Sequence, residues 1–65
     1  MSTGLTGREV IVEMHRFGSI VKVTAMDTKT LTEISVQGPA SAGEVALRKN
    51  ALARLEYVLK KKGHI

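Results

Sequence analysis

The first half of the chain alternates apolar and polar residues with a period of two. From Arg8 to Phe17, Val10, Val12 and Met14 fall on one side, and the segment is rich in β-branched residues. This pattern predicts a strand with one buried face. Gly18-Ser19 follows directly, and a two-residue loop that begins with Gly is typical of a type II′ hairpin turn. The turn pairs Phe17 with Ile20, Arg16 with Val21, Met14 with Val23, and Val12 with Ala25.

A second turn is expected at Asp27-Thr28-Lys29-Thr30, because an Asp side chain can bond to its own backbone. With Thr28-Lys29 as the loop, Ala25 pairs with Thr32, Val23 with Ile34, and Val21 with Val36. Both turns place Val21, Val23 and Ala25 on one face, and a slip of one residue at either turn would destroy that agreement. The sequence therefore predicts a three-stranded antiparallel meander.

The last third of the chain has the pattern of a helix. Gly38-Pro39 ends the sheet, Ser41 and Glu44 have the spacing of a capping box, and Gly63 can provide the C-terminal cap. We expect the helix to run from about Ala42 to Lys62. Its apolar residues form one stripe, which should pack on the apolar face of the sheet. The stripe comprises Val45, Leu47, Ala51, Leu52, Leu55, Val58 and Leu59. Arg48 falls near the centre of this stripe. Either its aliphatic stem packs on the core while its guanidinium lies in water or on Glu44, or its guanidinium recognises a ligand.

The predicted fold class is therefore α+β, in the order β-β-β-α, with one domain over residues 8–65 after a disordered N-terminus at residues 1–7. The chain has 65 residues and no cysteine. A core this small provides only marginal stability, and without disulfides the remaining way to increase it is oligomerisation. We expect a homodimer, in which the helix is either kept or exchanged across the short Gly38-Pro39 hinge.

The predicted outer face of the sheet is more apolar than a face open to water should be. Apolar residues gather at its two ends, with polar residues between them. On the helix, Tyr57 lies opposite the apolar stripe, where it is either a half-exposed ring or part of a contact surface. The candidate protein-interaction surface comprises Tyr57, Ala53, Phe17, Ile20, Ile11, Met26 and Leu31.

The net charge of +4 is confined to the last part of the chain. Residues 1–37 hold four basic and four acidic side chains, whereas residues 38–65 hold six basic and two acidic ones. Lysines at a helix C-terminus are favoured by the helix dipole alone. The alternative is weak electrostatic binding of nucleic acid, for which the candidate contacts are Arg54, Lys60, Lys61 and Lys62. The chain has only two aromatic residues to stack on bases.

The chain contains no pattern typical of an enzyme, and we predict no catalytic residue, no metal and no cofactor. Glu13, His15 and Glu33 share the outer sheet face, but a flat face offers no pocket that would shift a pKa. No apolar run is long enough to cross a membrane, and no secretory signal is visible, so we expect a cytoplasmic protein.

Several short stretches resemble a family of short uncharacterised proteins found mostly in alphaproteobacteria. They are Arg8-Glu9-Val10, Gly18, Val21-Lys22-Val23, Thr32-Glu33, Gly38-Pro39-Ala40 and the run from Leu52 to Leu59. The resemblance covers nearly the whole chain after residue 7. The family has no assigned activity, so the resemblance implies no catalytic residues and suggests an accessory or regulatory protein.

Overall fold

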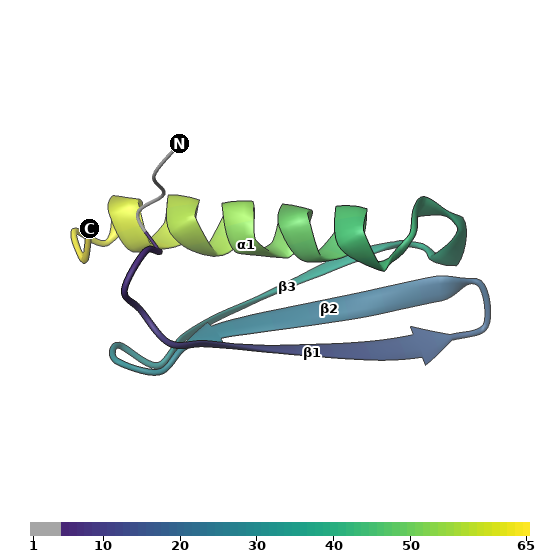
Figure 1. Cartoon of the computed structure of the whole chain (residues 1–65), viewed down its shortest axis with the longest axis horizontal. Helices are drawn as coiled ribbons and strands as arrows, with labels where there is room; N and C mark the ends of the chain where they lie inside the picture. The colour runs from purple at the N-terminus through teal and green to yellow at the C-terminus, as the bar shows by residue number, and fades with distance from the viewer. Residues whose placement is uncertain (1–4) are drawn as a thin grey trace.

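Three strands form one antiparallel sheet, and a single helix lies along one face of it (Figure 1). A computed structural model of the chain describes residues 5–65. The strands follow one another in the order β1-β2-β3, as a meander. The elements are β1 (Val10–Phe17), β2 (Ile20–Asp27), β3 (Thr32–Pro39), a short 3-10 helix η1 (Ala40–Ala42) and α1 (Glu44–Lys61). The predicted fold class is confirmed.

The first hairpin has the predicted register. Phe17 pairs with Ile20, Met14 with Val23, and Val12 with Ala25. Gly18 has a positive φ of 62°. A positive φ at the first loop residue alone is the property of a type II′ turn, whose twist matches that of the strands it joins.

The second hairpin differs from the prediction by two residues. Its loop has four residues, 28–31, so that Asp27 pairs with Thr32, Ala25 with Ile34, and Val23 with Val36. The Asp27 carboxylate accepts hydrogen bonds from the backbone N–H of Thr30 at 3.0 Å and from its hydroxyl at 2.7 Å. These bonds stabilise the longer loop, in which Leu31 has a φ of 59°. Because side chains alternate with a period of two, a shift of two residues leaves each one on its predicted face.

The helix begins later than predicted, and the capping box does not form. Ser41 lies inside η1, and the N-cap of α1 is Gly43, which has a φ of 87° and no side-chain cap. The break occurs at Gly43 because glycine readily adopts this conformation. Glu44 is then the first helical residue, where its charge complements the positive end of the dipole.

The core lies between α1 and the two strands β2 and β3. The helix contributes Leu47, Ala51, Leu55 and Leu59, one on each successive turn, and the sheet contributes Val23 and Ala25. The predicted stripe is therefore too wide. Val45 is 82% exposed, and Leu52 and Val58 are only half-buried, because α1 turns the row spaced by four residues toward the sheet. Arg48 is exposed and not central to the buried row.

The chain enters the domain through residues 5–7, which form a turn, and Leu5 packs against the core. The N-terminus predicted to be disordered covers residues 1–7, of which residues 1–4 lie outside the described residues. In the structure α1 lies on its own sheet, and its exchange between protomers stays a prediction.

Candidate interaction surfaces

A groove runs between strand β1 and helix α1, on the inner side of the sheet. It exists because α1 packs over β2 and β3 and leaves β1 to one side. The groove has a volume of about 670 Å³. Its apolar surface comes from Leu5, Val10, Val12 and Leu52, and Ala53 also lines it. We call it the β1–α1 groove. The apolar side chains of β1 that line it are only half-buried, so the inner face of this strand is only partly covered.

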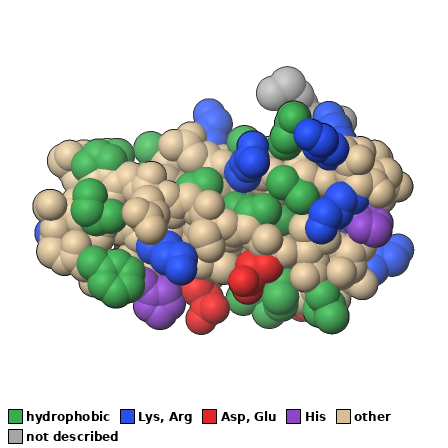
Figure 2. Space-filling view, turned by 180° about the vertical axis from the view of Figure 1, so that it is seen from behind, with side chains coloured by type: hydrophobic (Ala, Val, Ile, Leu, Met, Phe, Trp, Pro, Cys, Tyr) green, Lys and Arg blue, Asp and Glu red, His purple; other side chains and the backbone are tan. Residues whose placement is uncertain are grey.

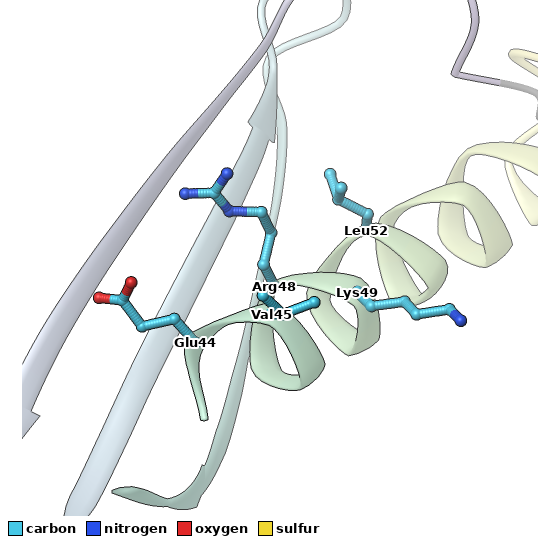
Figure 3. A pocket seen from close by; sticks show the side chains of 5 residues that line it. All are labelled: Glu44, Val45, Arg48, Lys49 and Leu52. Carbon is cyan, nitrogen blue, oxygen red and sulfur yellow. The ribbon is translucent and has the colours of Figure 1, made fainter. Parts of the chain in front are cut away.

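The charged residues beside the groove are predominantly cationic. Arg8 and Glu56 line it too, but they pair with Asp27 and Lys60 respectively. Among residues 5–65, neither Arg48 nor Lys49 has a carboxylate within ion-pair distance. Figure 3 shows a hollow beside the groove, lined by Glu44, Val45, Arg48, Lys49 and Leu52. Arg48 and Glu44 extend from α1 toward the strands there, whereas Lys49 points away (Figure 3).

Strand β1 also presents an open backbone edge. Phe17 and Ile20 flank a two-residue turn and therefore form a hydrogen-bonded pair, after which such pairs recur at every second residue. The bond from the N–H of Thr28 to the carbonyl of Glu9, at 3.2 Å, follows the same alternation. The backbone groups of Val10, Val12, Met14 and Arg16 consequently point away from β2. Within the described sheet no strand pairs with this edge.

The outer face of the sheet brings the predicted apolar residues into two groups. Ile11 lies opposite Met26, and Phe17 lies opposite Ile20. The exposed fractions are 47% for Ile11, 64% for Phe17, 42% for Ile20 and 72% for Leu31, and Met26 is half-buried. Figure 2 shows hydrophobic side chains toward both ends of the lower part of the molecule, with acidic and histidine side chains between them. The two groups remain apart within one chain.

Between these two groups lies a polar band. Glu13 is opposite Thr24, and His15 is opposite Lys22. The hydroxyls of Thr24 and Ser35 are 3.2 Å apart and share a hydrogen bond. Glu13 and His15 lie on the exposed outer face, on the opposite side of the sheet from the β1–α1 groove. The β1–α1 groove therefore does not reach this pair.

Tyr57 lies among cations on the exposed side of α1. The Cζ of Arg54 is 5.3 Å from the centre of the ring, and the Nζ of Lys61 is 5.9 Å from it, distances typical of cation–π contacts. Arg54 and Lys61, two of the candidate nucleic-acid contacts, therefore lie against Tyr57, which belongs to the candidate protein-interaction surface. Lys60 instead forms an ion pair with Glu56 at 3.6 Å, and Lys62 is the C-cap of α1. Figure 2 shows Lys and Arg side chains concentrated toward the end of the molecule where α1 finishes.

An ion pair between Arg8 and the buried Asp27, which no local sequence pattern predicts, fixes the start of β1. The Nε and Nη2 of Arg8 donate to the two carboxylate oxygens of Asp27, each at 3.0 Å. Asp27 is fully buried, and its bonds with Arg8 and with the Thr30 hydroxyl hold the pKa of this carboxyl well below its ordinary range. The only signal in the sequence was the turn position of Asp27. The partner 19 residues earlier became visible only once the strands were paired.

Neither a metal centre nor a membrane segment is found in residues 5–65. This part of the chain contains no group of three or more His, Asp or Glu side chains that could hold a metal ion. None of its helices has both the length and the apolar character needed to cross a membrane.

Comparison with known proteins identifies one family. A family model described as a domain of unknown function, DUF6898, matches residues 7–62 of this chain. No curated protein and no solved structure matches the chain.

Proposed function

Because this chain belongs to the DUF6898 family, whose function is unknown, we propose from its geometry that it is a non-enzymatic, homodimeric and cytoplasmic protein-interaction module. The observation that carries the proposal is the incomplete cover of β1. Its inner side chains line the β1–α1 groove, and its backbone edge is open. An open edge and a half-covered apolar strand are the features that a second chain buries.

The two features accept different partners. The edge accepts a strand, which a second copy of the chain can supply. The groove accepts apolar side chains. Among residues 5–65, Arg48 and Lys49 at the groove and Glu44 beside it have no ion-pair partner, so the charge left there is predominantly positive. A protein that presents apolar side chains flanked by acidic ones complements this surface in both respects.

The dimer is tested by light scattering coupled to gel filtration at tens of micromolar. A mass of about 14 kDa is expected, twice the 7.0 kDa of one chain. A mass near that of one chain would refute the homodimer.

The groove is tested by affinity capture from a lysate with two baits, the native chain and the Arg48→Glu/Lys49→Glu variant. Both residues are exposed, so the variant should fold normally. We expect a partner that the native chain retains, that the variant releases, and that carries an acidic face. Equal retention by both baits would contradict the role of the groove.

The cluster of Arg54, Tyr57 and Lys61 supports a second candidate function, weak binding of single-stranded nucleic acid. A ring that stacks on a base beside cations that contact phosphates is the usual arrangement for such binding. Gel retardation with single-stranded RNA and DNA at two salt concentrations tests it. An electrostatic binder loses affinity with a log–log slope of about 0.7 per phosphate contact. Binding that Tyr57→Ala leaves unchanged would argue against stacking on this ring.

A further inference from the structure

We propose that two copies of the chain pair through strand β1, antiparallel and in one register, with Met14 on the two-fold axis. The result is a continuous six-stranded sheet with both helices on the same face. This inference rests on the proposed homodimer and adds to it the contacting edge, the register and the residues that select that register.

The sheet has two edges, and only β1 suits a second copy. Strand β3 directs the backbone of Glu33, Ser35 and Gln37 outward, and its outer side chains at these positions are polar. It ends at Pro39, which has no N–H to donate. Strand β1 has eight residues without Gly or Pro, an inner face that α1 leaves half-covered, and the exposed Ile11 and Phe17 on its outer face.

The backbone limits the registers that are available. The outward-pointing backbone groups belong to alternate residues of β1, and these residues must pair with one another across the interface. The two-fold axis therefore passes through a residue and not between two residues. It can lie at Val12, Glu13, Met14 or His15. With the axis at Val12, Ile11 faces Glu13 of the second copy and Arg16 faces Arg8. With the axis at Glu13, the two Glu13 carboxylates face each other, an arrangement that destabilises a sheet. With the axis at His15, the two imidazoles face each other and Glu13 faces Phe17.

The register centred on Met14 differs from the others because every outer pair is complementary. Glu13 faces His15 of the second copy, and Ile11 faces its Phe17, each contact occurring twice by symmetry. The pairing already present within each chain extends these contacts. Met26 and Ile11 of one copy then lie in line with Phe17 and Ile20 of the other, and the four side chains form one apolar row across four strands. The two apolar groups that stay apart in one chain thus become neighbours in the dimer.

The polar band is completed in the same way. Thr24 and Glu13 of one copy continue into His15 and Lys22 of the other. The carboxylate of Glu13 therefore gains an imidazole N–H donor directly opposite and an ammonium group one strand further on. Complementary cross-strand pairs stabilise a sheet, and here they favour one register over the others.

The Glu13–His15 contact is tested by exchanging the two positions. Glu13→Lys and His15→Glu are each expected to raise the dissociation constant of the dimer by about 2- to 30-fold, since each alters two pairs per dimer. The double variant, Glu13→Lys/His15→Glu, places complementary side chains at the two facing positions again and should regain most of the affinity. Glu33→Lys, a charge reversal on the exposed face of β3, is the matched control and should leave the constant unchanged. Sedimentation over a dilution series measures all four variants.

Cysteine cross-linking tests the register directly, since the native chain has no cysteine. In this register Glu13 and His15 face each other as a non-hydrogen-bonded pair, with Cα atoms about 4.5 Å apart, close enough for a disulfide. A mixture of Glu13→Cys and His15→Cys chains should therefore cross-link faster than either variant alone. Faster linking of Glu13→Cys with itself would place the axis at Glu13 and overturn the register. A dimeric mass with neither cross-linking nor charge rescue would overturn the edge and leave the homodimer standing, whereas a monomeric mass would overturn both.

Discussion

At Gly38, strand β3 passes so close to α1 that a side chain has no room. A Cβ added there would lie 2.5 Å from Cδ2 of Leu47, which is only 4% exposed. Leu47 is held by the core and would have to move. We expect Gly38→Ala to lower the free energy of unfolding by about 1–3 kcal/mol, the usual cost of overpacking. Urea denaturation measures this loss, and a stability equal to that of the native chain would show that Leu47 relaxes freely.

The buried Arg8–Asp27 pair should make stability sensitive to acid. Arg8, and then the Thr30 hydroxyl, lower the pKa of the Asp27 carboxyl in the folded chain. A lowered folded-state pKa adds stability that is complete above the unfolded pKa of about 3.9 and is lost as the pH falls below it. The melting temperature should therefore be flat above about pH 5 and fall steadily below about pH 4 on account of this group.

Asp27→Asn separates this effect from that of the other carboxylates. The variant has no charge at position 27 to pair with Arg8, so it should melt at a lower temperature than the native chain at pH 7. Its melting temperature should also fall less steeply in acid. If the two chains lose stability in parallel below pH 4, the carboxyl at position 27 is not the group that titrates.

At the scale of the element, α1 buries a narrower row than its composition indicates. Leu55 is fully buried, whereas Val45 is 82% exposed although both belong to the predicted stripe. Leu55→Ala should cost about 2–5 kcal/mol, the range for a buried leucine, which is a large share of the stability of a small domain. Val45→Ala should change stability by less than about 0.5 kcal/mol. Thermal melts of the two variants that shift equally would contradict this orientation of the helix.

The turn between β2 and β3 shows why element boundaries were less well predicted than the elements themselves. A loop of Thr28-Lys29 places the apolar side chains of β2 and β3 on the same face, but a loop that is two residues longer does so equally well. What selected the longer loop was Asp27, which bonds to Thr30 on one side and to Arg8 on the other. A contact with a residue so far away in the sequence cannot be derived from the local pattern.

At the scale of the whole molecule, the two edges of the sheet should behave differently in solution. In the proposed dimer the outward N–H groups of Val12 and Met14 are hydrogen-bonded, whereas those of Ser35 and Gln37 face solvent. Amide hydrogen exchange should therefore be slow at Val12 and Met14 and fast at Ser35 and Gln37. Dilution below the dissociation constant should remove the protection on β1 alone. Exchange at Val12 as fast as at Ser35 at every concentration would mean that the β1 edge is open.

The candidate site was only partly visible in the sequence. The mixed character of the outer face, with Ile11 and Phe17 among polar residues, was predicted from alternation alone. The β1–α1 groove was not, since it depends on which strands α1 covers. The meeting of Tyr57 with Arg54 and Lys61 follows from helical spacing and was within reach of the sequence, because residues three and four apart share a helix face.

Local sequence patterns were sufficient to predict the order of the elements, the first hairpin and the face on which each strand residue lies. These depend on local periodicity and on one glycine turn, and both act over a few residues. Three features depend instead on tertiary packing: α1 lies over β2 and β3, Arg8 reaches Asp27, and β1 keeps an open edge and a half-covered inner face. The helix can rotate and slide over the sheet without changing any local preference, so its final position is set by how Leu47, Ala51, Leu55 and Leu59 pack together with the sheet.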